Sequence, residues 1–501
     1  MASAAALMPQ TAARLVAQIA LPSTREGEGF QASVALSLCV SSCLKGQGVV
    51  HVACATSSCE LHWYRLTYNA PSSTPSLTHV GTCAFGGKIT ACEFVNMQPG
   101  SFEGGNNAQG TQWLVATCAD GSVKCFDVNK EGSAASTPAA ILQTPGAEAW
   151  AVCGAPAQHL PWNVAVGRSD GTIQLFDARK ADEAIATLRS FHSEGVTGMA
   201  SYSFDDRPMI FTAAQDGLIC LFDIARATGT TATTAAAARE SAPAATPKRQ
   251  KTRVSPPESY DDDEYVDDED DDDEDDDEDD ELLAGVVPVG SACEHIWTFA
   301  SDDHDHSCES GANIACQTTD EGVFLYDVDA DLMGATETLG SSDARRISPP
   351  PVGALVAASE TEHLPGDGGW RRVDGSDATY VIGVVRCGGS RMVALGTSNG
   401  SAGLFDARCL VPGRAADALV VFAGGGKEGE GRAHTDVVRG LTVVSEVSVG
   451  EEGKSCLAVS VGEEGKLCLW EFRIAKQLKS ESESGGGGGG GGGGVKRKKK
   501  R

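Results

Sequence analysis

The chain is punctuated by short β-prone runs, in which hydrophobic residues are continuous or alternate with polar ones, on either side of Asp-Gly or a similar dipeptide. The clearest example begins with residues 164–168, turns at Asp170-Gly171, and continues through residues 173–176 to Asp177. Two such runs around Asp-Gly are a strong signal for a β-hairpin. We expect a tight primed turn, in which both central residues have positive φ.

This strand–turn–strand pattern recurs in seven copies along the chain. The first copy is degenerate, because Ser57-Ser58 stands where the others have Asp-Gly, Glu-Gly or Asn-Gly. The most closely spaced copies end 50 and 46 residues apart, which fits a four-stranded unit of about 40 to 45 residues plus a loop. Such repeats are typical of sheets arranged radially around an axis. The aromatic residues that end the copies are Trp63, Phe126, Phe176, Phe222, Tyr326, Phe405 and Trp470.

An acidic residue follows the aromatic one in most copies, and the last copy is introduced by His434-Thr-Asp436-Val-Val. In these features the chain, from about residue 35 to about residue 475 apart from one long insertion, resembles the WD-repeat β-propeller family. The resemblance implies a seven-bladed β-propeller that acts as a scaffold in the nucleus. It brings no catalytic residues with it.

The resemblance also implies a buried hydrogen-bond network in each full repeat, made by a His, a Ser or Thr, the turn Asp and the Trp. Only the last copy offers a nearly complete set, namely His434, Ser460, Glu464 and Trp470. Most other copies have Phe or Tyr in place of Trp, and a Phe ring cannot donate the indole hydrogen bond. We expect packing to replace the network in those copies.

Composition shifts divide the chain into five segments. Residues 15–22 are predicted to form the outermost strand of the last blade, pairing with the unit that ends at Phe472 and so removing an exposed sheet edge. The segment between the fourth and fifth copies is expected to be disordered, because its dense like charge and few apolar residues cannot offset the entropy of ordering. The expected segments are an N-terminal extension (1–14), blades one to four (15–225), a disordered basic and acidic loop (226–283), blades five to seven (284–475), and a Gly-rich linker with a disordered basic C-terminal tail (476–501).

The formal net charge of −29 reflects mainly one segment, since 19 acidic residues lie between positions 261 and 281. Two short basic clusters stand beside the predicted blades, and such clusters are typical of nuclear targeting or of nucleic-acid contact. The acidic run could bind basic nuclear proteins by counter-charge, or act as a solvated spacer. The residues assigned to nuclear targeting are Lys248, Arg249, Lys251, Arg253, Lys496, Arg497, Lys498, Lys499, Lys500 and Arg501.

Two copies end in Phe-Asp-Ala-Arg, and this ending is similar to the Trp-Asp-x-Arg ending with which some WD-repeat proteins dock on the adaptor of cullin-4 ubiquitin ligases. The resemblance assigns possible adaptor docking to Asp177 and Arg179, and to Asp406 and Arg408. A bidentate Arg–carboxylate pair would be a credible anchor. The alternative is that each Arg only ends a strand and covers its neighbour.

Catalytic and metal-binding signals are weak. The chain has no Gly-x-Ser-x-Gly elbow, no P-loop and no His-Glu-x-x-His motif. His304, His306 and Cys308 are metal-ligand types, but they stand in a short hydrophilic stretch, and we expect no metal and no cofactor there. The 17 cysteines are scattered singly through the predicted strands, which favours reduced thiols over a disulfide framework.

These observations predict a monomeric, non-catalytic scaffold that binds other proteins, such as a multiprotein complex or basic nuclear proteins. We expect a nuclear or nucleolar location with the cytoplasm as the fallback, no membrane contact, and at most a secondary role for nucleic acid. The first alternative is substrate reception for a cullin-4 type ubiquitin ligase. The second is a propeller hydrolase.

Overall fold

The computed structural model covers the repeat region with gaps. Everything structural below refers to residues 11–21, 25–26, 29–30, 35–41, 48–68, 75–97, 111–130, 132–156, 160, 162–180, 183–189, 191–204, 207–224, 283–289, 291–299, 311–318, 323–329, 353–355, 379–387, 390–397, 400–406, 419–422, 433–448 and 454–473.

The described part of the chain is all-β, with two short 3₁₀ turns, η1 (Gly132–Ala134) and η2 (Ala178–Lys180). Its first three main sheets each use four consecutive strands in chain order. They are β5 (Ala35–Val40), β6 (Val49–Thr56), β7 (Glu60–Thr67) and β8 (Ser76–Ala84); β9 (Ile89–Met97), β10 (Thr111–Cys118), β11 (Ser122–Asp127) and β12 (Ala140–Gln143); and β13 (Ala149–Gly154), β14 (Val164–Arg168), β15 (Ile173–Phe176) and β16 (Ala186–Leu188).

The remaining sheets follow the same antiparallel order, and two of them also take in a strand from the N-terminus. They are β17 (Val196–Phe204), β18 (Arg207–Ala214), β19 (Leu218–Asp223) and β20 (Leu283–Pro288); β21 (Cys293–Phe299), β22 (Gly311–Thr318), β23 (Val323–Asp329) and β24 (Gly353–Leu355); β25 (Thr379–Cys387), β26 (Ser390–Thr397), β27 (Ala402–Asp406), β28 (Val420–Phe422) and β1 (Thr11–Ala12); β29 (Val438–Ser448), β30 (Lys454–Gly462), β31 (Lys466–Arg473) and β2 (Arg14–Ala20); and a small ribbon of β3 (Arg25–Glu26) and β4 (Gly29–Phe30).

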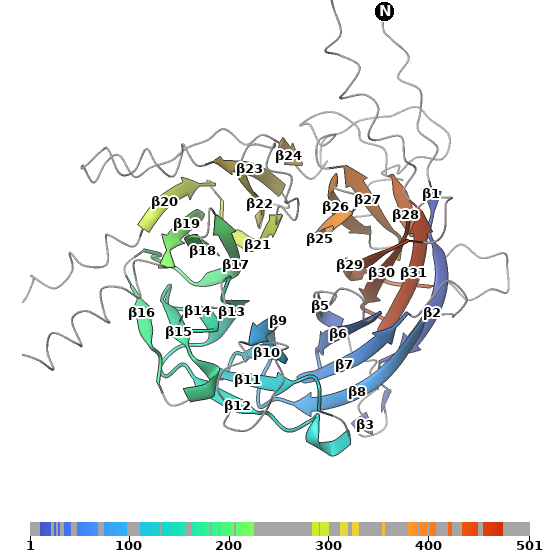
Figure 1. Ribbon diagram of the computed structural model, residues 1–501, viewed down its shortest axis with the longest axis horizontal. Helices are drawn as coiled ribbons and strands as arrows, with labels where there is room; N and C mark the ends of the chain where they lie inside the picture. Colours follow the sequence, from blue (N-terminus) through green and yellow to red (C-terminus); the bar gives the residue numbers. More distant parts are fainter. Residues whose placement is uncertain are drawn as a thin grey trace, which may run out of the picture.

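The sheets are arranged around a central axis in a propeller-like way, with the first strand of each sheet nearest the axis (Figure 1). Each inner strand contacts the inner strand of the next sheet, in the order β5, β9, β13, β17, β21, β25 and β29, and β29 in turn lies against β5. The all-β class and the four-stranded antiparallel sheets expected from the sequence are therefore confirmed.

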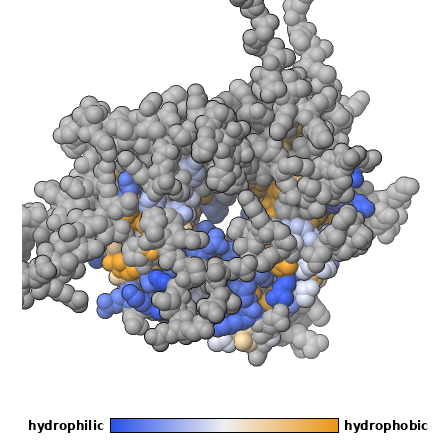
Figure 2. Space-filling model, viewed as in Figure 1, coloured by the Kyte–Doolittle hydropathy of each residue, from blue (hydrophilic) through white to orange (hydrophobic). Residues whose placement is uncertain are grey.

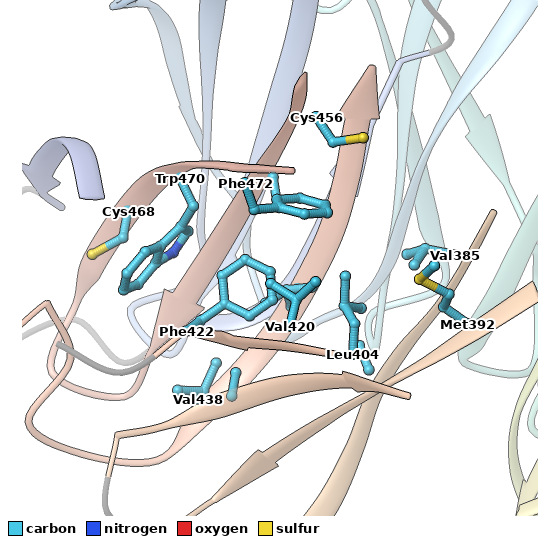
Figure 3. Packing of buried hydrophobic residues seen from close by; sticks show 14 of the residues in the cluster. Val385, Met392, Leu404, Val420, Phe422, Val438, Cys456, Cys468, Trp470 and Phe472 are labelled. Atoms are coloured by element: carbon cyan, nitrogen blue, oxygen red, sulfur yellow. The ribbon is translucent and has the colours of Figure 1, made fainter. Parts of the chain in front are cut away.

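The hydrophobic core lies between neighbouring sheets. One core cluster joins Val385, Met392 and Phe422 of the β25–β28 sheet to Trp470 and Phe472 on β31 (Figure 3). Phe422 meets the rings of both aromatic residues edge-on, with centroid separations of 5.5 Å. Trp470, the aromatic residue that ends the last unit, is thus an inter-sheet contact, and edge-to-face pairs of this kind add about 0.5–1.5 kcal/mol beyond burial.

The hairpin turns differ from the primed turns that the sequence suggests. Gly121 has φ +80°, but neither Ala119 nor Asp120 has positive φ, and the Gly121 N–H donates to the Cys118 carbonyl at 3.0 Å. The turn is therefore a three-residue loop that ends in a left-handed glycine, a common alternative in hairpins. The same arrangement is found at Gly171, Gly217 and Gly465.

The degenerate first unit follows the same rule with a different residue. Cys59 has φ +60° and donates its N–H to the Thr56 carbonyl at 3.1 Å, so it takes the position that glycine holds elsewhere. The substitution that matters is therefore Cys59 for Gly, one residue beyond the Ser57-Ser58 pair that the sequence pattern singled out. A non-glycine residue in the left-handed region stores strain of about 1–2 kcal/mol.

The long charged insertion lies elsewhere in the topology than expected. β20 pairs antiparallel with β19, with Leu218 opposite Pro288. Residues 225–282 therefore connect the third and fourth strands of one sheet instead of two successive units. The sequence pattern could not show this, because it ended each unit at its aromatic residue, whereas the outermost strand follows that residue.

The N-terminal residues join two sheets. β2 pairs antiparallel with β31, with Leu15 opposite Trp470. β1 pairs parallel with β28, although the sequence placed it in an N-terminal extension. Residues 11–20 therefore cross from the outer edge of one sheet to the outer edge of the next. None of the helical segments in the described part of the chain is long and apolar enough to cross a membrane.

Candidate functional site

The polar residues of the last unit form a continuous buried chain. His434 precedes β29, Ser460 lies on β30 and Trp470 on β31. His434 Nε2 lies 2.6 Å from Ser460 Oγ, and Trp470 Nε1 donates to the same hydroxyl at 2.7 Å. The hydroxyl accepts from the indole, and when the imidazole is neutral with its proton on Nδ1 the hydroxyl donates to His434 Nε2. The structure thus brings together these three residues of the expected network.

The other side of the imidazole faces the turn carboxylate. His434 Nδ1 lies 2.6 Å from Glu464 Oε1, so the Nδ1–H donates to the carboxylate. The second oxygen, Glu464 Oε2, is buried and has no hydrogen-bond partner. The network is complete in its connections but leaves one acceptor of Glu464 unsatisfied.

A second network of this kind lies in the β17–β20 sheet, where the sequence analysis expected packing alone. His192 Nε2 lies 2.8 Å from Thr212 Oγ1, and His192 Nδ1 lies 3.1 Å from Asp216 Oδ2. The carboxylate also accepts the backbone N–H groups of Ser193 and Leu218. The signal was present in the sequence, because Thr212 stands four residues before Asp216 just as Ser460 stands four before Glu464.

These contacts set the charge state of the turn carboxylate. Burial acts to raise the pKa of Asp216, but hydrogen bonds from His192 and from the Leu218 and Ser193 backbone outweigh it and hold the pKa below the ordinary value. The carboxylate is therefore ionised at neutral pH and serves as a fixed acceptor at the turn.

The candidate docking residue Arg179 is engaged within its own chain. Its Nε donates to Asp177 Oδ1 at 2.7 Å and its Nη2 to Asp177 Oδ2 at 2.9 Å, a bidentate pair. Asn163 donates to the same carboxylate at 3.0 Å and accepts from the Ala178 N–H at 2.8 Å. The Asp177 side chain is buried and that of Arg179 is 30% exposed, so the pair fixes the start of η2 and leaves part of the guanidinium at the surface.

The second copy of the docking motif is only partly within the described residues. Asp406 ends β27 opposite Met392, and Arg408 lies outside the described residues. Both basic clusters, residues 248–253 and 496–501, and the acidic run 261–281 lie outside them as well. The His304–Cys308 stretch does too.

A third group of polar residues also brings together a histidine, a hydroxyl and a carboxylate. His62 on β7 has Nδ1 2.9 Å from Thr82 Oγ1 on β8, and Nε2 3.4 Å from Glu60 Oε2. Burial lowers the pKa of His62, so the imidazole is neutral at neutral pH. The hydroxyl is shared, however, because His79 Nε2 also lies 2.9 Å from Thr82 Oγ1. A hydroxyl held between two imidazoles is restrained in a local network rather than aimed at a substrate.

The hairpin turns and the incoming loops meet at the same end of each sheet. Ser169 N–H donates to Glu148 O, and Gln215 N–H donates to Gly195 O. Successive sheets touch at these ends, since Thr90 Oγ1 donates to Ala149 O at 2.5 Å and Thr197 Oγ1 to Cys293 O at 2.6 Å. We call this surface the turn face, defined by residues 85–88, 119–121, 144–148, 169–171, 192–195, 215–217, 434–437 and 463–465.

The turn face is acidic. Its ranges contain one lysine, Lys88, and eight acidic residues. Arginines that flank it are already paired, Arg168 with Asp170 at 3.1 Å and Arg439 with Glu463. The acidic residues are Asp120, Glu148, Asp170, Glu194, Asp216, Asp436, Glu463 and Glu464.

The described residues include no group of three or more His, Cys, Asp or Glu side chains placed to hold a metal ion. Three of their buried histidines, His62, His192 and His434, lie beside hydroxyl and carboxylate groups within the sheets, as shown above. No protein-family model matches the chain, and no curated protein matches it either.

Proposed function

We propose that this protein is a seven-bladed WD-repeat β-propeller that serves as a non-catalytic scaffold for protein–protein interaction in the nucleus. The observation that carries the proposal is that its catalytic-looking side chains are used to hold sheets and turns together. His192, His434 and Arg179 each contact a carboxylate of a neighbouring turn or strand end. Side chains engaged in these contacts stabilise the sheets, and partners would be bound by other residues on the surface.

The surface supports binding through polar contacts. The exposed large hydrophobic residues in the described part are Ile141, at 46%, and Ile185, at 40%. Hydrophilic side chains gather around the centre of the face in view and over the β9–β12 sheet, with smaller apolar areas beside them (Figure 2). A surface of this kind suits partners bound by charge and hydrogen bonds.

The acidic charge of the turn face favours basic partners. Eight acidic residues exceed Lys88 and the two flanking arginines, and this excess of negative charge would attract basic proteins and raise their association rate. Nuclear proteins rich in Lys and Arg, such as histones, meet this requirement. The basic clusters at 248–253 and 496–501 would carry the protein to the nucleus.

Binding of purified histones to the full-length protein tests the scaffold proposal. The charge reversals Glu194→Lys and Asp436→Lys, at exposed positions on the turn face, should weaken binding at least tenfold at about 50 mM salt, where screening is weak. The control is Glu183→Lys, an exposed acidic residue outside the turn face, which should bind as the wild type does. Equal loss in all three variants, or none, would refute the assignment to the turn face.

Two further measurements address location and catalysis. Replacing the lysines and arginines of both basic clusters by Ala should move a fluorescent fusion out of the nucleus. The scaffold proposal is wrong if the protein hydrolyses small esters and Thr82→Ala abolishes that turnover. Thr82 is the right probe because it is the hydroxyl that lies beside both His62 and His79.

Adaptor docking is retained as a second candidate because Arg179 is both held rigidly and partly exposed. Arg179→Ala should abolish capture of a purified cullin-4 adaptor, whereas Lys180→Ala, its neighbour in η2, should not. Capture that survives Arg179→Ala would rule out this motif as the anchor.

A further inference from the structure

Two cysteine thiols from different sheets lie side by side next to the central axis. Cys39 is on β5 and Cys92 is on β9, the inner strands of the first two main sheets. Their sulfur atoms are 3.5 Å apart, and 53 residues separate them in the chain. The two sheets contact each other through these strands, so the pair spans an inter-sheet junction.

The backbone holds both residues in register. Cys39 lies opposite Ala53 of β6, and Cys92 lies opposite Ala116 of β10. Cys92 is buried at 9% exposure and Cys39 is half-buried. Cys39 is therefore the more exposed residue of the pair, and it is the one assigned to the first attack on a small reagent in solution.

The groups around Cys39 keep its sulfur protonated at neutral pH. Burial, the thiol of Cys92 and the carboxyl of Glu93 all raise the pKa of Cys39, and Cys54 on β6 adds to the effect. Burial raises the pKa of Glu93 to about 8, although a hydrogen bond from the Gly154 backbone opposes this. Cys153 on β13 lies beside the same carboxyl. No basic side chain is among the groups that shift the pKa of Cys39.

We propose that Cys39 and Cys92 are a redox-active dithiol that forms a reversible disulfide by exchange with a small disulfide such as oxidised glutathione. The thiolate of Cys39 attacks one sulfur of glutathione disulfide and releases one glutathione thiolate. The thiolate of Cys92 then attacks Cys39 in the mixed disulfide and releases the second. Two protein thiols lose two electrons and two protons, and one glutathione disulfide becomes two glutathione thiols.

The geometry requires only a small movement. An S–S bond is about 2.05 Å long, so the two sulfur atoms must approach by roughly 1.5 Å, which side-chain rotation can supply. The resulting bond would staple the inner strands of two sheets and close a long loop, which restricts the unfolded chain. A second buried pair, Cys293 and Cys316, also hydrogen bonds through sulfur, but both residues are 0% exposed. The Cys293–Cys316 pair therefore has no exposed thiol for the attack on glutathione disulfide.

Incubation of the reduced full-length protein with glutathione disulfide tests the proposal. Peptide mapping should find the Cys39–Cys92 cross-link, with the mass lowered by two hydrogen atoms and no Cys293–Cys316 cross-link. Thermal unfolding should shift upward by about 3 °C or more. The rate should rise as the pH goes from about 7 to about 9, because the thiolate is the attacking species.

Single variants separate the two roles. In Cys92→Ser, Cys39 should still attack glutathione disulfide, and the reaction should stop at a glutathione adduct on Cys39. Cys39→Ser should react with glutathione disulfide at least tenfold more slowly than the wild-type protein. The proposal is overturned if the wild-type protein gains no Cys39–Cys92 cross-link, or if the pair oxidises no faster than Cys293 and Cys316. Mapping the wild-type protein keeps the test valid even where a variant does not fold.

Discussion

The β17–β20 sheet and the sheet of β29, β30, β31 and β2 each contain a hydrogen-bond network centred on a histidine, and the two networks differ in one member. In both, the imidazole joins a strand hydroxyl to a turn carboxylate. In both, a thiol on the third strand lies near the carbonyl of the residue before the histidine, Cys220 with Phe191 and Cys468 with Ala433. The difference is that Trp470 extends the chain of hydrogen bonds, whereas Phe222 ends it.

The aromatic residue differs between the two networks: where one has a hydrogen bond, the other has ring packing. Trp470 donates to Ser460, while Phe222 packs edge-on against Phe191 with centroids 4.9 Å apart. Both aromatic residues are buried. The hydrogen bonds among histidine, hydroxyl and carboxylate therefore form with or without the indole.

The size of the turn acid is matched by the size of a nearby residue on the preceding strand. Gly462 lies opposite Val438, and the equivalent residue in the other sheet is Ala214 opposite Val196. A Cβ at Gly462 would overlap the Glu464 carboxylate and lie 2.7 Å from His434 Nδ1. The longer acid is accommodated next to glycine, and the shorter Asp216 next to alanine. A turn acid and its neighbour on the strand must therefore be considered together.

The largest expected effect breaks this compensation. Gly462→Ala should destabilise the protein by about 2–3 kcal/mol in chemical denaturation, because the new methyl group overpacks a filled space. Adding Glu464→Asp should restore most of the loss, since the pair then matches Ala214 and Asp216. A cost for the double variant as large as for the single one would show that the two sheets are not equivalent.

A smaller effect measures the indole hydrogen bond. Trp470→Phe should destabilise by about 1–2 kcal/mol, since it removes the donor to Ser460 along with some buried volume. Trp63→Phe is the matched control, because the buried Trp63 Nε1 has no hydrogen-bond partner and this variant should show only the smaller cost of the lost volume. Equal losses in the two variants would assign the effect to volume alone.

The smallest expected effect concerns pH. Because the folded pKa of Asp216 lies below the unfolded one, the unfolded chain binds more protons as the solution is acidified, and the stabilisation present above about pH 4 is lost as pH falls through the folded pKa. Asp216→Asn should flatten the decline of melting temperature below about pH 4. Asp436→Asn, at an exposed position on the equivalent loop, should leave that decline unchanged. A flattening in both would point to net charge as the cause.

Local patterns predicted more of the molecule than long-range ones. The alternation around Asp170-Gly171 identified a hairpin, and the residues of the His434 network were named from the resemblance of the last copy to a WD repeat. The turn conformation was wrong, since the sequence dipeptide does not distinguish a two-residue loop from a three-residue loop that ends in the same glycine. The His192 network was missed because an absent Trp was taken to mean an absent network.

The features that sequence could not supply depend on partners far along the chain. The place of β20 is fixed by pairing with β19 across residues 225–282, and hydrophobic periodicity carries no information on pairing partners. Approach of Cys39 to Cys92 likewise depends on how two sheets meet. The single cysteines gave no spacing signal, and only the assembled inner strands place them together.

The position of the charged insertion also affects how the chain is held together after cleavage. β20 is contributed from beyond residues 225–282 to a sheet whose other strands come from before them, and β2 is contributed from the N-terminus to the sheet of β31. The two halves of the chain therefore complete each other's sheets at two separate junctions. A protease that cuts within 225–282 would sever the covalent chain while both ladders remain paired, so the two fragments should migrate as one particle until they are unfolded.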